Sequence, residues 1–251
     1  MGCAMGDLQT LDLVFFAGGT FTAAFVTGLA GFAFGIVAAA VWLHFLAPTQ
    51  VTPLIVAFAL IVQGVSVWKL RHAIKLDRLW PFILGSALGV PFGAALLRLA
   101  PASQMRMTIG ILLVAFSLYT WFRPNSAIMS RVGPLADTGI GVVNGIIGGA
   151  TGLAGIAVVV WCNLRGWPAA EQRAVFQPSG VATFVMIVLW LGGTGMIGAD
   201  SAWLFLLGLP VLALGTWAGL KSFGRLNDAA FRRVVLVLLL LSGASLLLRA
   251  G

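Results

Sequence analysis

The sequence predicts an all-α polytopic membrane protein with two homologous halves and about 8–10 transmembrane or half-membrane helices. Three observations predict this fold: an apolar composition, a series of apolar segments, and motifs that occur once in each half. Of the 251 residues, 60% are hydrophobic and 9% are charged. A soluble domain has about 25% charged residues, so we expect lipid to be the main solvent of this chain.

The charged and reactive residues narrow the function. The 15 lysines and arginines outnumber the 7 acids, but they stand mostly in short breaks between apolar segments. This placement is typical of charges that set topology at a bilayer surface, not of nucleic-acid binding. The two cysteines are far apart, the two histidines are isolated, and acids are few. We therefore expect no cofactor, no metal, no nucleic-acid partner and no enzyme activity.

Ten apolar segments follow one another along the chain. They cover residues 13–28, 31–46, 51–69, 79–99, 104–122, 135–150, 153–164, 175–193, 200–221 and 229–249. Several are long enough to cross a hydrocarbon core of about 30 Å at about 1.5 Å per residue. The shorter ones are either thin spans or half-helices.

Three landmarks recur in the same order in both halves. They are the pentapeptide Thr-Gly-Leu-Ala-Gly at 27–31 and 151–155, the motif Asp-x-x-Trp-x-Phe-x-x-Gly that begins at Asp77 and Asp200, and the prolines Pro53 and Pro178. Internal repeats are common in secondary transporters. We expect a first transmembrane repeat over 1–122, a cytoplasmic linker over 123–134 and a second repeat over 135–251.

The basic residues predict that the two repeats are inverted. The break at 69–78 holds four basic residues, whereas its equivalent in the second half holds only Asp200. Because basic loops stay in the cytoplasm, equivalent loops fall on opposite sides of the membrane. The break at 165–173 is then also cytoplasmic, and both termini lie outside. Each half makes five crossings, or three crossings and a re-entrant hairpin; eight spans in parallel halves are the alternative.

Each pentapeptide predicts a break in a membrane helix. Glycine costs about 1 kcal/mol relative to alanine in a helix, and irregular backbone at membrane depth persists only inside protein or beside water. N–H groups freed at the start of a half-helix favour an anion. The residues predicted here to bind a small anionic solute are Thr27, Gly28, Gly31, Thr151, Gly152 and Gly155. Close helix packing, with each threonine bonded to its own helix, is the alternative.

Polar residues near the two prolines predict further donors. Gln177 and Ser179 flank the second proline, and Thr52 precedes the first. Proline suits a helix start or kink, so these side chains are expected to converge on one neutral, donor-rich pocket, with helix capping as the alternative. Gln63 lies deeper in its segment, and we expect it either to line the pocket or to pack as a polar group between helices.

Two further features concern helix contacts. Glycines spaced by four predict close approach of neighbouring helices; they are Gly85, Gly89 and Gly93 in the first half and Gly141, Gly145 and Gly149 in the second. Asn144 is a polar group within an apolar segment. It either faces a cavity or forms hydrogen bonds across helices.

The stretch KLRHAIKLDRLWPFILGSALGVPFGAALL at 69–97 resembles the sulfite exporter TauE/SafE family. So do GIIGGATGLAGIAVVV at 145–160 and WPAAEQRAVFQPSGVATF at 167–184. The resemblance extends over about 20–248. It implies an integral inner-membrane protein that moves small sulfur-containing anions such as sulfite and organosulfonates. This chain departs from the family where members often carry a run of consecutive glycines.

These observations together predict a multi-pass permease of the cell inner membrane. It would move a small anion, with sulfite or an organosulfonate favoured, by alternating access around a site between the repeats. Its partners would be the anionic solute and the lipid bilayer, and the sequence leaves open whether the protein forms a homo-oligomer. The alternative is a channel or a membrane scaffold or assembly protein.

Overall fold

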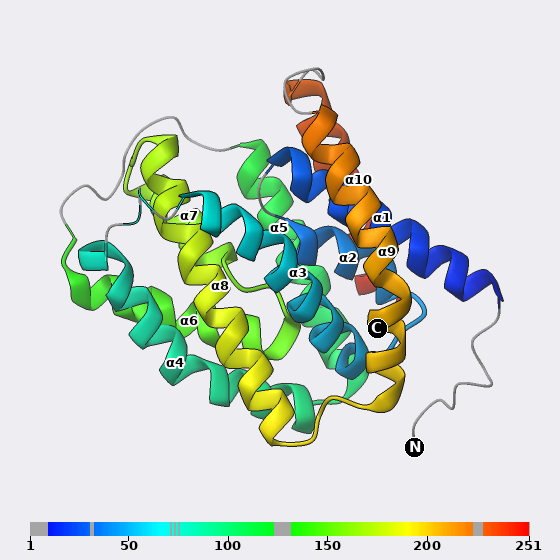
Figure 1. Ribbon diagram of the computed structural model, residues 1–251. Helices are drawn as coiled ribbons and strands as arrows, with labels where there is room; N and C mark the ends of the chain where they lie inside the picture. The colour runs from blue at the N-terminus through cyan, green and yellow to red at the C-terminus, as the bar shows by residue number, and fades with distance from the viewer. Residues whose placement is uncertain are drawn as a thin grey trace.

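The computed structural model describes residues 10–30, 33–70, 72, 74, 76–122, 132–222 and 228–250, and within them the regular elements are ten α-helices (Figure 1). The helices are α1 (Thr10–Ala30), α2 (Phe34–Trp42), α3 (Pro48–Leu70), α4 (Leu76–Leu99), α5 (Ala102–Trp121), α6 (Pro134–Thr151), α7 (Ile156–Leu164), α8 (Ala169–Gly193), α9 (Ala199–Ser222) and α10 (Asp228–Ala250). In this part of the chain, six helices are long and apolar enough to cross a membrane: α1, α3, α4, α5, α8 and α9. The predicted all-α polytopic fold is confirmed.

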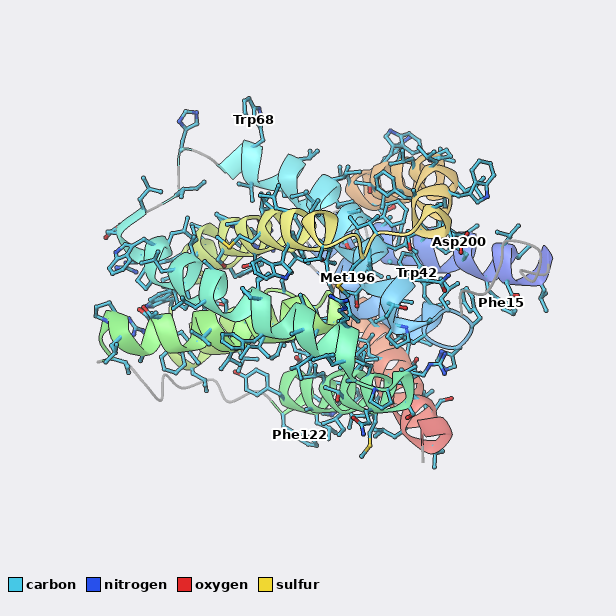
Figure 2. All side chains as sticks on the ribbon, turned by 90° about the horizontal axis from the view of Figure 1, so that it is seen from below. Phe15, Trp42, Trp68, Phe122, Met196 and Asp200 are labelled. Atoms are coloured by element: carbon cyan, nitrogen blue, oxygen red, sulfur yellow. The ribbon has the colours of Figure 1, made fainter. Side chains whose placement is uncertain are left out.

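The outside of the bundle is covered with large apolar side chains. Figure 2 shows Trp68 and Phe122 at the periphery, where they are 71% and 75% exposed, whereas Trp42 is buried inside. A water-soluble protein rarely exposes so much contiguous apolar surface. In a bilayer these side chains contact lipid, so the surface agrees with a multi-pass membrane protein.

Six helices pack as a row whose order follows the repeat. The order of packing partners is α6, α4, α8, α3, α9 and α1 (Figure 1). If the halves are exchanged, so that α1 corresponds to α6, α3 to α8 and α4 to α9, the row becomes itself in reverse. The remaining long pair, α5 and α10, also corresponds by position, and these two helices pack on each other.

Glycines hold the neighbouring helices of this row at backbone contact. A Cβ atom added to Gly141 would lie 2.5 Å from the Phe82 oxygen, and one added to Gly149 would lie 2.7 Å from the Val90 oxygen. The glycines of α4 that face them have equally little room. In lipid, helices associate through this kind of close van der Waals packing, so the packing role predicted for the spaced glycines is confirmed.

Two pairs of helices fold back on themselves as hairpins. At the open end of the α6–α7 hairpin, Trp161 Nε1 donates to Asp137 Oδ1 at 2.7 Å. At the open end of the α1–α2 hairpin, Trp42 Nε1 donates to the Phe16 oxygen at 3.4 Å. α2 and α7 have 9 residues each and are therefore about 13 Å long, too short to cross the bilayer. α1, by contrast, is long enough to cross, and the number of crossings per half stays a prediction.

The two hairpins open toward opposite ends of α4. Arg78, at the start of α4, and Arg165, after α7, stack on the Trp167 ring with guanidinium-to-centroid distances of 5.3 and 5.0 Å. At the other end, Arg106 near the start of α5 donates to the Leu46 oxygen after α2 at 3.3 Å. Inverted repeats require such an antiparallel pair of hairpins, but the inversion itself stays a prediction.

Segments that the sequence assigns to the cytoplasm meet at one end of the bundle. Arg165 Nη1 donates at 2.6 Å to the oxygen of Val132, which belongs to the predicted linker. Arg78 pairs with Glu171 and thereby joins the start of α4 to the start of α8. The side of the membrane on which this end lies stays a prediction, as does the division into two repeats, and linker residues 123–131 lie outside the described part of the chain.

Candidate functional site

Both helix breaks reach the wall of one small cavity. The cavity is lined by Ala33, Gly35 and Ile36 of the first break and the start of α2, by Gly152, Leu153, Ala154, Gly155, Ile156 and Val159 of the second break and α7, and by Gln63, Phe116, Phe176 and Phe184 of α3, α5 and α8. Its volume is about 30 Å³, which is room for about two water molecules. Each predicted break therefore ends at the same interior space.

The two breaks also touch each other directly. A Cβ atom added to Gly35 would lie 3.2 Å from Leu153 Cδ2 and 3.3 Å from the Gly152 oxygen. Gly152 is left-handed, with a φ of 75°, and packs against the Ile55 side chain of α3. The tip of each hairpin is thus in contact with the other half of the molecule.

The half-helices α2 and α7 begin at this cavity without a side-chain cap. The residues that precede them, Ala33 and Gly155, are left-handed, with φ values of 86° and 100°. The first intrahelical hydrogen bonds come from Val37 N–H to Ala33 O at 3.1 Å and from Val159 N–H to Gly155 O at 2.8 Å. The N–H groups between these residues have no acceptor within their own helix, and they carry the partial positive charge of a helix start.

Asn144 fixes the second break in place. Its Oδ1 accepts the Gly155 N–H at 2.6 Å, and its Nδ2 donates to Ser86 Oγ and to Thr183 Oγ1, both at 3.3 Å. Both hydroxyls donate their own hydrogens to backbone carbonyls of α6 and α8, so they accept from Asn144. The fully buried amide thereby ties α4, α6 and α8 to the start of α7 and bonds across helices.

Three of the predicted binding residues lie on the cavity wall: Gln63, Gly152 and Gly155. Gln63 is 7% exposed as a residue, and a Cβ atom added to Gly180 of α8 would lie 3.2 Å from its Oε1. Buried side-chain amides are nearly always hydrogen-bonded in native proteins. The amide of Gln63 lies on the wall, and its role in binding a solute stays a prediction.

Four other predicted residues are buried close to the breaks but not on the wall. Thr52 Oγ1 donates to the Ala150 oxygen at 3.4 Å, Thr151 Oγ1 to the Ile147 oxygen at 2.6 Å, and Ser179 Oγ to the Phe176 oxygen at 3.0 Å. Gln177 is buried as well. In this arrangement the three hydroxyl hydrogens are used within the protein, and the role of these four residues in binding a solute stays a prediction.

The first pentapeptide contacts α9 instead of the cavity. Thr27 Oγ1 donates to the Ala23 oxygen of its own helix at 2.7 Å. A Cβ atom added to Gly28 would lie 2.9 Å from the Thr216 oxygen, so this glycine permits close packing of α1 on α9. Gly31 lies outside the described residues. Solute binding by these three residues stays a prediction.

The sequence did not identify the phenylalanines of the wall or the start of α2. Phe116, Phe176 and Phe184 come from α5 and α8, and nothing in an apolar segment distinguishes an aromatic ring that faces a cavity from one that faces lipid. Ala33 and Gly35 follow the first pentapeptide closely, and this proximity is the signal that would have found them.

Comparison with known protein families matches residues 15–246 to the family described as sulfite exporter TauE/SafE. The chain belongs to the sulfite exporter TauE/SafE family. The match includes the breaks of both halves and confirms the resemblance seen in the sequence. The TauE/SafE family is one of transporters, which agrees with a membrane transport protein and not with an enzyme. No curated protein and no solved structure matches the chain.

Proposed function

We propose that this TauE/SafE protein is a permease of the cell inner membrane that moves sulfite or an organosulfonate by alternating access. The observation that carries the proposal is the meeting of two uncapped helix starts, one from each half, at one buried cavity. Their N–H groups favour an anion, and the Gln63 amide adds a side-chain donor. Membership of the family supplies the chemical class of the solute.

Neutral donors suit a carrier because the solute has to leave again. None of the described wall residues is an arginine or a lysine, so the bound anion would be held by hydrogen bonds and partial charges alone. A carrier needs a site that binds the solute and also releases it. The cavity is small, at about 30 Å³, and this size favours a carrier over an open, water-filled channel.

The antiparallel hairpins provide two ends that can be closed independently. One end carries the Arg165–Asp137 and Arg78–Glu171 ion pairs, and the other carries the hydrogen bond from Arg106 to Leu46. Alternating access requires that one end loosens while the other stays closed around a site near the bilayer midplane. Each hairpin connects its own end of the bundle to the cavity.

Reconstitution of the purified protein in liposomes tests the proposed function. We expect saturable uptake of labelled sulfite or methanesulfonate that is accelerated when the vesicles are preloaded with the same unlabelled anion. Uptake without this counterflow would identify a channel. Absence of uptake of any small anion would favour a scaffold or assembly protein.

A further inference from the structure

We propose that the groove between α1, α2 and α10 is a binding site for phosphatidylethanolamine, a phospholipid whose headgroup carries a primary ammonium. The site is separate from the central cavity and does not depend on which solute the protein moves. Three features indicate this ligand: the size and place of the groove, the order of polar and apolar side chains along it, and the hydrogen-bonding groups at its rim.

The groove is large and lies on the outer surface of the bundle. The almost wholly buried α2 is its floor and packs on both α1 and α10, which form the walls. Its volume is about 550 Å³, against about 30 Å³ for the central cavity, and ligand pockets of organic-molecule size have about 300–1,000 Å³. Phe15 stands on the outside of α1 (Figure 2), and it and Leu241 of α10 are 52% and 62% exposed. The groove therefore opens toward the lipid.

The side chains along the groove change from polar to apolar with depth. Asp12 lies in the first turn of α1, at the start of the apolar span Leu11–Leu29, and His44 follows the end of α2. His44 Nε2 is 3.4 Å from Ser245 Oγ, so this part of α10 lies at the same level. Leu238 precedes Ser245 by two helical turns and lies about 10 Å deeper along α10. This order matches a phospholipid, whose headgroup lies at the membrane surface and whose acyl chains lie within.

The rim of the groove offers acceptors for a cation. None of the described residues that line it is a lysine or an arginine, and Asp12 is its one acid. The Ser242 hydroxyl gives its hydrogen to the Ala40 oxygen, so its own oxygen can only accept. The start of α1 and the end of α2 both lie at this rim, and their partial charges oppose each other. The Asp12 carboxylate therefore determines the sign, and a primary ammonium with its N–H donors is the matching group.

His44 adds a donor for the phosphate of the same headgroup. An imidazole N–H can donate to a phosphate oxygen whether the ring is neutral or charged. A short ethylene link joins phosphate and ammonium in phosphatidylethanolamine, so one headgroup can serve His44 and Asp12 together. A choline headgroup has the same charge but no N–H to donate. A glycerol headgroup has no cation and leaves the lipid with a net negative charge, which Asp12 repels.

A series of methylated lipids tests the site. The full chain, purified in detergent and freed of bound lipid, is titrated with phosphatidylethanolamine, its N-methyl and N,N-dimethyl forms, and phosphatidylcholine. Native mass spectrometry gives the affinity for the first bound lipid. The four headgroups have the same charge and lose one N–H at each step. We expect the affinity to fall along the series by about tenfold in all, because a charge-assisted hydrogen bond to Asp12 is lost. Phosphatidylglycerol should bind no tighter than phosphatidylcholine.

Substitutions locate the preference in the groove. In Asp12→Asn the carboxylate is gone, and we expect phosphatidylethanolamine and phosphatidylcholine to bind with equal affinity. Asp200→Asn is the matched control, since it removes an acid from the first turn of α9 that does not line the groove; the preference for phosphatidylethanolamine should stay. Leu241→Trp narrows the groove and should weaken the binding of both lipids.

Three results would overturn the proposed lipid site. They are equal affinities of the unaltered protein for phosphatidylethanolamine and phosphatidylcholine, binding of phosphatidylglycerol as tight as that of phosphatidylethanolamine, and a preference that survives in Asp12→Asn. A dimer that retains no lipid would identify a second copy of the chain as the occupant and would also overturn it. If Asp12→Asn does not fold, the methylated series on the unaltered protein decides.

Discussion

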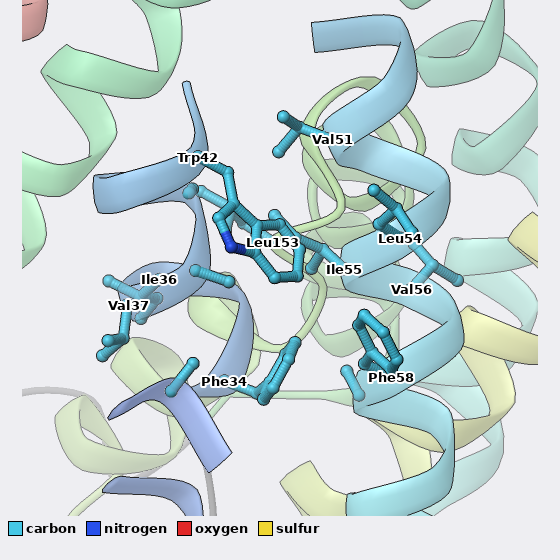
Figure 3. Packing of buried hydrophobic residues seen from close by; sticks show 14 of the residues in the cluster. Phe34, Ile36, Val37, Trp42, Val51, Leu54, Ile55, Val56, Phe58 and Leu153 are labelled. Atoms are coloured by element: carbon cyan, nitrogen blue, oxygen red, sulfur yellow. The ribbon is translucent and has the colours of Figure 1, made fainter. Parts of the chain in front are cut away.

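The two helix breaks face the same cavity but are held by different interactions. The second break is fixed by the hydrogen bonds of Asn144. The first lies among fully buried rings: the Phe34 and Phe58 centroids are 5.8 Å apart, and those of Trp42 and Phe58 are 5.9 Å apart. Figure 3 shows these rings between α2 and α3, with Leu153 of the second break beside them.

This difference separates a directional contact from a non-directional one. A hydrogen bond to Gly155 holds one atom at one distance and angle, and its loss leaves buried polar groups unpaired. Apolar packing around Phe34 depends on filled volume, and side chains of this kind can repack with a smaller change of free energy. We therefore expect the second hairpin to be the fixed reference of the pair and the first to shift more readily.

Removing the amide of Asn144 should have the largest effect. In Asn144→Leu, which keeps a similar volume, the Gly155 N–H loses its acceptor and two hydroxyls lose a donor. Each buried group left unsatisfied costs about 1–3 kcal/mol, so we expect a total loss of about 3 kcal/mol or more and the loss of uptake. Thermal unfolding in detergent and liposome uptake are the measurements.

Thr183→Val is the matched control for that substitution. It removes only one partner of Asn144, so about 1 kcal/mol of stability should be lost and most of the uptake kept. Equal effects of the two substitutions would show that Asn144 does not organise the second break.

Disrupting the open end of the second hairpin should have a smaller effect. Asp137→Asn removes the carboxylate that pairs with Arg165. The two side chains are largely buried, with exposed fractions of 10% for Asp137 and 13% for Arg165. We expect a loss of about 2 kcal/mol in stability, because breaking a largely buried pair leaves one charge uncompensated. Trp42→Phe, which removes the hydrogen bond of the first hairpin, is the comparison, and a larger loss in that variant would reverse the ranking. Thermal unfolding measures both.

Substitutions of the left-handed residues at the two breaks should change the stability of the protein in opposite directions. Gly155→Ala forces a side chain into a left-handed conformation, which costs about 1–2 kcal/mol, although a Cβ there meets no atom within 4 Å. Ala33→Gly removes the same strain at the first break and is expected to raise stability by about 1 kcal/mol or less. Unfolding midpoints in urea measure both changes, and a stabilising Gly155→Ala would contradict the geometry.

The smallest expected effect is a difference in hydrogen exchange between α2 and α7, and it tests the comparison of the two hairpins most directly. If the first hairpin shifts more readily, backbone amides of α2 exchange faster than those of α7 in the same detergent sample. The two helices have equal lengths, which makes them matched probes. Faster exchange in α7 would mean that the hydrogen-bonded break is the mobile one.

The sequence predicted the helices and the breaks because these depend on local properties. Each of the ten apolar segments overlaps one helix, and α1 and α6 end within the two pentapeptides. The spaced glycines also indicated close helix packing directly, since only a close neighbour requires a row of residues without side chains. These features follow from hydropathy, helix propensity and spacing along one helix face.

The site was predicted less completely because it depends on which way side chains face. Thr52 and Ser179 were expected to serve a solute, but each hydroxyl donates to a nearby carbonyl, as such groups often do in apolar helices. Gln63 was singled out as a pocket or packing group from its depth in a segment, and it lies on the cavity wall. The partners of Asn144 come from three helices, and no spacing in the sequence indicates that they meet.

The helix contacts between the two halves have a consequence for how the halves came to be joined. α4 packs on α6, α1 on α9, α3 on α8 and α5 on α10, so every one of these contacts links one half to the other. Residues 1–122 alone would leave the glycine face of α4 bare, and the cavity would lack one of its helix starts. A gene encoding a single half would therefore have to produce two copies that interlock in opposite orientations before any solute could be carried.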